Sequence, residues 1–137
     1  MPFIGLLYVS ESCLAPEDTA SEIGLIVGVS SLRNAALDVN GALLFTGTYF
    51  AQRLEGPAEV ISALMTSIEA DARHRNVRIV DNAHIPYRKF SRWNMAYNGP
   101  SHFVERHIEC IFQSPEETPL TTDVDRLIRI MLEFQRN

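Results

Sequence analysis

Residues 41–57 read GALLFTGTYFAQRLEGP, and this stretch predicts a β-hairpin. Two runs of residues that favour strands flank a short turn centred on Gly47. Successive side chains of a strand point to opposite faces, so Gln52 shares its face with Phe50 and Leu54. A buried amide needs partners for both its donors and its acceptor. The hairpin therefore predicts a polar group inside an apolar layer.

Strand and helix patterns continue on both sides of the hairpin. Residues 3–9, 76–85 and 92–97 have the composition of strands, and residues 19–34 and 58–72 carry apolar side chains at helical spacing. The resulting order, β-α-β-β-α-β-β, predicts an α+β fold of the ferredoxin-like type, with an antiparallel or mixed sheet and two helices on one face.

The C-terminal part of the chain is expected to cover the other face of this sheet. Residues 103–112 and 121–134 have helical apolar spacing, and an uncovered sheet face would expose an apolar patch. We expect one domain in which residues 1–98 form the main body and residues 99–137 form a helical cap.

Two glycines four residues apart interrupt the first predicted helix. Gly24 and Gly28 each cost ~1 kcal/mol relative to alanine in a helix. Together they leave a shallow place on one helix face. This place either admits a close neighbour, such as a strand or a flat ligand, or reflects tight packing of the helix on the sheet.

Bulk properties exclude several function classes. The chain has 137 residues and a formal net charge of -5, which argues against a nucleic-acid binder. The basic cluster Arg73, His74, Arg75 and Arg78 is too small for a duplex footprint, and a solvated helix end is the simpler interpretation. We expect a cytoplasmic protein, because no signal peptide, membrane-length apolar run or cysteine framework is evident.

Catalytic motifs are not apparent in the sequence. The four histidines lack metal-ligand spacing, no Gly-rich phosphate loop of recognised form occurs, and no serine or cysteine has an obvious activating base. These features weaken an enzymatic interpretation and leave other functions of a ferredoxin-like fold open.

Six short motifs, each on the expected element, carry a family resemblance. They are Leu6-Leu7-Tyr8-Val9-Ser10, Ser30-Ser31-Leu32-Arg33-Asn34, Asn40-Gly41-Ala42-Leu43-Leu44-Phe45, Phe50-Ala51-Gln52-Arg53-Leu54-Glu55-Gly56-Pro57, Asp71-Ala72-Arg73-His74 and Phe90-Ser91-Arg92-Trp93-Asn94-Met95. In this order they resemble the BLUF family, the sensors of blue light using FAD, in its short single-domain form. The glutamine followed shortly by Leu-Glu-Gly is the most diagnostic piece.

The resemblance implies a photochemical site built around FAD, which would lie between the two helices. Tyr8 would donate an electron to the excited flavin, and Gln52 would link Tyr8 to the flavin ring and rearrange its hydrogen bonds. Trp93 and Met95 would pass the change to the tail. The implied cofactor-binding residues are Ser30, Asn34, Ile26, Phe50, Gln52, Leu54, Ile68, Asp71, Arg73 and His74.

Each of these residues also has a structural interpretation. Tyr8 can be a half-buried strand residue, Gln52 a satisfied core amide, and Asn34 a helix C-cap. Arg73 with His74 can be a pair of charges at a helix end. Trp93 and Met95 can be plain core. The order in which the motifs occur together favours the flavin site.

Three departures from the family pattern are visible. Asn40 replaces a usual threonine, the segment between Tyr8 and Asn34 is slightly long, and Arg53 stands where an apolar residue is common. By strand alternation Arg53 faces the tail helices, and we expect it to pair with one of three carboxylates or with a partner chain. The carboxylates are Glu105, Glu109 and Glu133.

Three functions are consistent with the sequence. The first is a photoreceptor that is not an enzyme and signals to a separate, unidentified protein partner or through its oligomeric state. The others are a flavin-dependent redox enzyme and a ligand-free interaction module of ferredoxin-like fold. A homo-oligomer is expected, with the tail helices and an exposed sheet face as its surface, and no nucleic-acid or membrane partner is expected.

Overall fold

The computed structural model describes residues 2–115 and 121–135. Its helices and strands, in chain order, are β1 (Phe3–Ser12), α1 (Thr19–Ala36), β2 (Asn40–Phe45), β3 (Tyr49–Pro57), α2 (Ala58–Glu69), β4 (His74–His84), β5 (Trp93–Asn98), α3 (His102–Gln113) and α4 (Thr121–Gln135), and the short 3-10 helix Pro16–Asp18 precedes α1. This order confirms the predicted α+β ferredoxin-like fold.

The five strands form one mixed sheet in the order β4-β1-β3-β2-β5. β1 pairs antiparallel with β3 and β4, and β2 pairs antiparallel with β3. β5 runs parallel to β2 at the edge. One row of neighbouring residues crosses the sheet from Tyr8 through Gln52 and Leu43 to Met95. The register therefore brings together residues that are far apart in the sequence.

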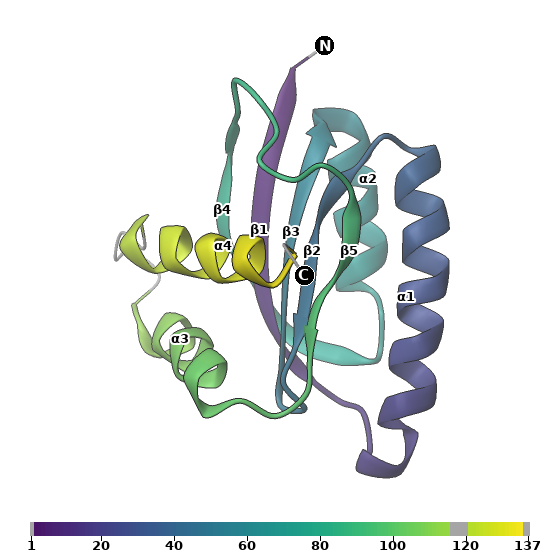
Figure 1. The fold of residues 1–137 in the computed structure, drawn as a ribbon, viewed down its shortest axis with the longest axis vertical. Coiled ribbons are helices and arrows are strands. Elements are labelled where there is room, and N and C mark those ends of the chain that lie inside the picture. The colour runs from purple at the N-terminus through teal and green to yellow at the C-terminus, as the bar shows by residue number, and fades with distance from the viewer. Residues whose placement is uncertain (1, 116–120, 136–137) are drawn as a thin grey trace.

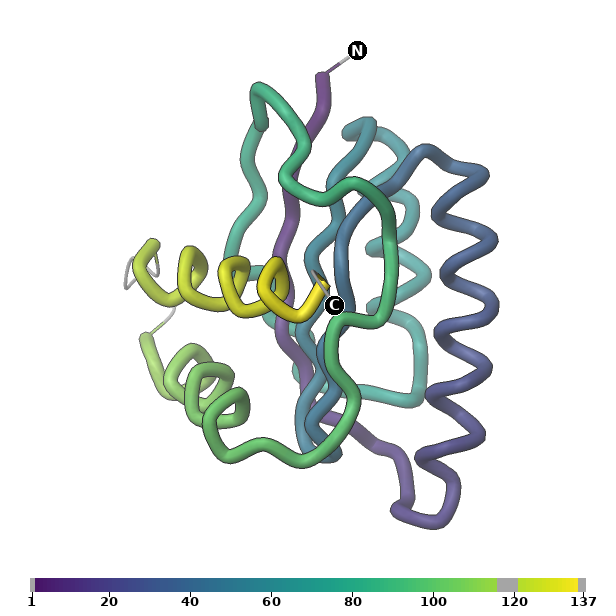
Figure 2. The backbone as a smooth tube through the Cα atoms, in the orientation of Figure 1, coloured from purple at the N-terminus to yellow at the C-terminus, as the bar shows by residue number. Residues whose placement is uncertain are grey.

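Helices cover both faces of the sheet (Figure 1). α1 and α2 pack on one face, around a core that includes Tyr8, Phe50, Leu54 and Ile61. α3 and α4 pack on the other face, and the tube in Figure 2 shows them on the far side of the sheet from α1. The prediction that the tail covers the second sheet face is confirmed, so the outer surface on that side belongs to α3 and α4.

The two glycines of α1 do not make the close contact that the sequence suggested. Gly24 and Gly28 are exposed, and no heavy atom lies within 4 Å of the Cβ position of either residue. The face of α1 that packs on the sheet instead presents Ile23, Ser30 and Asn34, which are buried. Neither the predicted close contact with a strand nor the alternative of tight packing on the sheet occurs at these glycines, because both face the solvent.

The basic cluster does not lie at a helix end. α2 stops at Glu69, and a turn follows in which the Asp71 carboxylate accepts from the backbone N–H of Arg73 at 2.9 Å. His74 and Arg75 already belong to β4. Arg78 donates to the backbone oxygen of Ile111 at 2.5 Å and that of Ser114 at 2.8 Å.

Arg78 therefore satisfies carbonyl groups at the C-terminal end of α3, which a helix cannot satisfy by itself. The simpler sequence interpretation of the cluster as a solvated helix end was wrong. Its members separate, because successive strand residues point to opposite faces of the sheet.

Arg53 points away from Gln52, as the alternation of strand residues predicts. The prediction that it pairs with a carboxylate of the tail helices was wrong. Its guanidinium lies 3.3 Å from the carboxylate of Glu55 and 3.0 Å from that of Asp81. It lies across Gly5 on β1, where a Cβ atom would be 2.1 Å from Arg53 Nη2. Because Gly5 leaves this space, the arginine lies along the sheet and reaches β4.

The Arg53 cluster also anchors the connection that leads into β5. Glu55 is fully buried, and its Oε1 atom accepts from the backbone N–H groups of Lys89 and Phe90 at 2.9 Å each. Asn40 reaches the same segment, since its side-chain amide donates to the carbonyl of Phe90 at 2.7 Å. These contacts position the start of β5 beside β2.

Candidate functional site

A chain of three buried polar side chains crosses the interior beneath α1 and α2. Gln52 Nε2 donates to the Tyr8 hydroxyl at 2.6 Å, and Trp93 Nε1 donates to Gln52 Oε1 at 2.9 Å. An indole can only donate, so Trp93 must face the amide oxygen. This requirement turns the amide nitrogen of Gln52 toward Tyr8. The orientation of the amide is therefore set by its two neighbours.

The protonation state of Tyr8 follows from its surroundings. Only 3% of the Tyr8 surface is exposed, and burial raises the pKa of its hydroxyl far above the usual range for a phenol. The hydrogen bond from Gln52 acts in the opposite direction and is the smaller effect. Tyr8 is consequently a neutral phenol at physiological pH. Any electron loss from it must be accompanied by loss of its hydroxyl proton.

A pocket opens over this polar chain and holds about 500 Å³ of free space, including the part open to solvent. α1, α2, the sheet and the turn after α2 each contribute to its wall. The predicted residues that line it are Tyr8, Ile26, Ser30, Phe50, Gln52, Ile68, Asp71, Arg73 and His74. Asn34 and Leu54 are fully buried and do not line the pocket surface.

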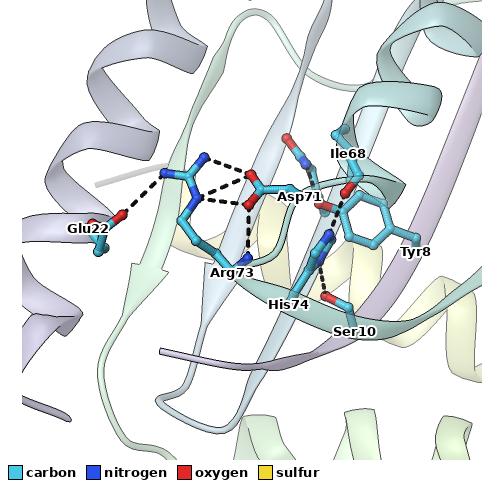
Figure 3. Close-up of polar contacts among 8 residues, drawn as sticks. Tyr8, Ser10, Glu22, Ile68, Asp71, Arg73 and His74 are labelled. Carbon is cyan, nitrogen blue, oxygen red and sulfur yellow. Dashed lines mark hydrogen bonds and ion pairs between the residues drawn. The ribbon is translucent and has the colours of Figure 1, made fainter. Parts of the chain in front are cut away.

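The rim of the pocket carries an ion-pair network (Figure 3). Arg73 contacts the Asp71 carboxylate at 2.7 Å and the Glu22 carboxylate at 3.5 Å. The hydrogen bond from Arg73 holds the pKa of Asp71 below its usual range, and Asp71 raises the pKa of Arg73. Arg73 is thus a charged group at the pocket and is positioned by two carboxylates from different segments.

His74 connects the rim to the sheet. Its Nε2 atom lies 2.5 Å from the carbonyl oxygen of Ile68, and its Nδ1 atom lies 2.7 Å from the Ser10 hydroxyl (Figure 3). A carbonyl oxygen can only accept, so Nε2 carries the hydrogen. His74 therefore joins the end of α2 to β1, directly beside the rings of Tyr8 and Phe50.

Asn34 contains an unpaired donor. Its Oδ1 atom accepts from Arg33 Nε at 3.3 Å, whereas its Nδ2 atom is buried and has no hydrogen-bond partner among the described residues. The C-cap of α1 is Leu37, so Asn34 is not the cap that the alternative interpretation supposed. A buried amide donor without an acceptor indicates that an acceptor is supplied from outside the chain.

Sequence reasoning missed four residues of this region. Arg33 and Leu43 line the pocket, Glu22 pairs with Arg73, and Ser10 contacts His74. Arg33 follows Ser30 at helical spacing, so that spacing was an available signal. Leu43 is the cross-strand neighbour of Gln52, which only the register reveals.

Comparison with known protein families decides the identity of the site. Residues 3–96 match the family model described as "BLUF: Sensors of blue-light using FAD". The chain belongs to the BLUF family. It is accordingly a blue-light photoreceptor domain, and FAD is the cofactor that the family uses.

Curated BLUF relatives are much longer than this chain. The photoactivated adenylate cyclase subunit alpha of Euglena gracilis is 29% identical over 129 residues, which is 94% of this chain and 12% of the cyclase. The blue light- and temperature-regulated antirepressor BluF of Escherichia coli (strain K12) is 32% identical over 87 residues, which is 64% of this chain and 22% of that protein. The match thus covers less than a quarter of either relative.

A solved BLUF structure of similar length agrees with the fold. The dark-state structure of BlrB, a BLUF protein, is 29% identical, has a TM-score of 0.79, and is matched over 96% of both chains. The photo-activated state of BlsA has a TM-score of 0.77 at 22% identity, with 95% of this chain and 94% of that chain covered. The BlsA likeness concerns the fold alone.

The pocket and Asn34, which is buried on the adjoining face of α1, fit a flavin on two observations. The unpaired Nδ2 donor of Asn34 suits a ring edge that carries acceptor oxygens and nitrogens. Ile26, Phe50 and Ile68 supply apolar walls for a flat ring, and Arg73 at the rim supplies positive charge for a phosphate group. The BLUF site therefore combines an apolar slot with polar groups at its inner and outer ends.

Other site types find less support. Among the described residues, His, Cys, Asp and Glu do not form a group of three or more that could bind a metal ion. Within the same residues, none of the helices is both long enough and apolar enough to cross a membrane.

Proposed function

We propose that this BLUF domain senses light by reversing the orientation of the Gln52 side-chain amide between Tyr8 and Trp93. The observation that carries the proposal is the continuous hydrogen-bonded chain from Tyr8 through Gln52 to Trp93. Tyr8 constrains one end of the Gln52 amide and Trp93 constrains the other. The network therefore has two distinct states, one for each orientation of the amide.

Bound FAD supplies the light absorption and, once excited, a strong electron acceptor. Tyr8 would give its electron, together with its hydroxyl proton, to the excited flavin, because its phenol is neutral and buried. When both return, the restored Tyr8 hydroxyl can donate a hydrogen bond. Gln52 would then present an acceptor to Tyr8, which is its oxygen after rotation of the amide or its nitrogen after tautomerisation.

Trp93 responds to this change for a simple geometric reason. After reversal, the donor end of Gln52 faces the indole N–H of Trp93, and two donors cannot form a hydrogen bond. The 2.9 Å contact between the two side chains is lost. Trp93 begins β5, and Met95 lies two residues further along that strand. We assign to Trp93 and Met95 the transmission of the signal into β5.

The cofactor would be held in three zones. Asn34 and Ser30 hold the polar edge of the ring, and the Asn34 donor gains the acceptor that the protein lacks. Ile26, Phe50, Leu54 and Ile68 enclose the ring. Arg73 and His74 lie at the ribityl phosphate end at the rim of the pocket, where the Asp71 carboxylate positions Arg73.

We propose that the domain passes on the light signal through a binding event and not through a chemical reaction that it catalyses. The chain would act in the cytoplasm, without catalysis, and would pass its state to a separate protein partner or change its oligomeric state. The Euglena relative is named as an adenylate cyclase subunit, but this chain matches only 12% of that protein.

Absorption spectroscopy of the FAD-loaded protein before and after blue light tests the proposal. We expect a reversible shift of the flavin bands to longer wavelength, and we expect Tyr8→Phe to abolish the shift. Tyr49→Phe is the matched control, because Tyr49 lies on the other side of the sheet against Phe112. A normal shift in Tyr8→Phe, or no shift in the parent protein, contradicts the mechanism.

A further inference from the structure

A second open cavity is lined by residues of α3 and α4. Figure 1 shows these two helices on the far side of the sheet from α1 and α2. This α3/α4 groove holds about 820 Å³ of free space, including the part open to solvent. Its apolar surface comes from Phe103, Ile130 and Phe134. Phe103 is 64% exposed, and its ring meets the His107 ring edge-on at 4.8 Å.

Ile130 and Phe134 pack against the core of the cap, whereas Phe103 does not belong to it. α3 packs on the sheet through Val104, Ile108 and Ile111, which are all buried. Phe103 lies next to this buried set and yet faces outward. An exposed phenylalanine that contributes little to packing is a candidate for contact with another molecule.

Two arginines flank the apolar surface. Arg126 and Arg129 lie on α4, three residues apart and therefore on one face of the helix, and both line the groove. Neither makes an ion pair with another described residue. The carboxylate on the groove, Glu133, already has a partner of its own. Both arginines are free to pair with carboxylates of another molecule.

The local charge is opposite to that of the whole chain. The protein has a formal net charge of -5, whereas the rim of the groove offers two guanidinium groups that lack an ion-pair partner among the described residues and lie beside aromatic rings. Arginine and aromatic side chains are the residues that contribute most to binding at protein interfaces. An apolar groove between two helices is also a site that can accept a further helix.

We propose that the α3/α4 groove binds an acidic amphipathic helix of a partner protein. Apolar side chains of that helix, spaced by three and four residues, enter the trough over Phe103 and Phe134. Its carboxylates pair with Arg126 and Arg129. On α4 the lining runs from Arg126 to Phe134, which corresponds to about 12 Å at the helical rise, or roughly two turns of the bound helix.

The groove is connected to the photochemical network through β5. The ring of Phe134 packs on Tyr97 of β5 with 4.8 Å between ring centres. Gln135 donates to the Asn94 side chain and to the backbone carbonyl of Gly41. Asn94 directly follows Trp93, so a displacement of β5 reaches one wall of the groove. Control of the groove by light rests on the proposed photoreceptor function, whereas binding of a helix by the groove does not.

The experiment uses the FAD-loaded full chain and two synthetic peptides. The first is a fluorescein-labelled 14-residue helical peptide with leucine on one face and glutamate on the other, and its twin has lysine in place of every glutamate. Fluorescence anisotropy measures the dissociation constants in the dark. We expect the acidic peptide to bind at least ~tenfold more tightly than its twin.

Charge reversal at the groove should remove this preference. We expect the double variant Arg126→Glu and Arg129→Glu to bind the acidic peptide at least ~tenfold more weakly, and Phe103→Ser to weaken it as well. The matched control is Arg75→Glu with Arg92→Glu, which makes the same change of charge at exposed positions away from the groove. The control should retain the affinity within ~twofold.

Three results overturn the proposal: no binding of the acidic peptide, equal binding of both peptides, or an equal loss in the control variant. The last result would indicate attraction by overall charge only. Recording the light-induced absorption shift of every sample separates this proposal from the photoreceptor mechanism. A normal shift without peptide binding contradicts the groove alone, and peptide binding without a shift contradicts the photochemical mechanism alone.

Discussion

Tyr8 and Gln52 lie directly opposite each other on β1 and β3, and their side chains share a 2.6 Å hydrogen bond. Both side chains are almost completely buried, so this bond is shielded from water. Trp93 binds the other end of the amide and determines which end faces Tyr8. Within the described residues, the proposed photochemical pair is thus already assembled by the pairing of the two strands.

Replacing Trp93 should affect stability more than photochemistry. Trp93→Phe removes the indole donor and leaves Gln52 Oε1 buried without that partner. We expect a loss of about 1–3 kcal/mol in the free energy of unfolding, measured by urea titration in the dark at saturating FAD. The red shift should persist but become smaller, because Tyr8 and Gln52 remain while Trp93 no longer fixes the orientation of the amide in the dark. Unchanged stability would show that water or another donor replaces the indole.

The raised pKa of Tyr8 predicts a loss of stability in alkali. In the unfolded chain Tyr8 ionises near pH ~10, whereas in the folded protein it stays protonated above that value. The stabilising effect is therefore complete below about pH 10 and declines as the pH rises further. Tyr8→Phe should show a shallower decline in the free energy of unfolding between about pH 10 and 11.

Ultraviolet absorbance of phenolate provides a direct check on the same residue. While the protein remains folded, the parent and Tyr8→Phe should develop equal phenolate absorbance as the pH rises to about 11. Extra phenolate in the parent relative to Tyr8→Phe would mean that Tyr8 is accessible to base.

The buried ion-pair cluster on the opposite face should be essential for folding. Glu55→Ala leaves Arg53 without its buried partner and also removes the acceptor of the Lys89 and Phe90 N–H groups. We expect a loss of about 3–5 kcal/mol in the free energy of unfolding, measured by chemical denaturation. Asp81→Ala should cost less, because that carboxylate is 33% exposed. Equal costs would argue that Asp81 is the principal partner of Arg53.

The link between β5 and α4 predicts that signalling can be separated from light absorption. Gln135→Ala removes the side-chain bonds to Asn94 and to the Gly41 carbonyl. We expect a normal absorption shift, together with loss of the light-induced change in backbone hydrogen exchange of α4 that the parent protein should show. Mass spectrometry of exchange in the dark and under blue light measures this. A parent-like change in Gln135→Ala would mean that the signal leaves by another route.

The sequence predicted the architecture and the face of each strand well. Alternation placed Gln52 with Phe50 and Leu54 on one side and Arg53 on the other, because strand geometry is a local property. Helical spacing likewise predicted the two tail helices to within two residues at their ends. These inferences needed no knowledge of which strands pair.

Long-range contacts were beyond what the residue pattern could predict. Arg53 reaches Asp81 because Gly5 on the neighbouring strand has no side chain, and a single sequence does not reveal that neighbour. Arg78 caps α3, although 33 residues separate it from Ile111. Gly24 and Gly28 were misinterpreted because spacing along a helix does not show which face is turned to the solvent.

A light-minus-dark absorption spectrum of Gln52→Leu, loaded with FAD, tests the central claim most directly. Leucine has nearly the volume of glutamine but cannot exchange a donor for an acceptor. We predict that the variant stays yellow and shows no light-induced red shift, while Gln113→Leu, an exposed change on α3, shifts like the parent protein. A reversible red shift of normal size in Gln52→Leu would contradict the account.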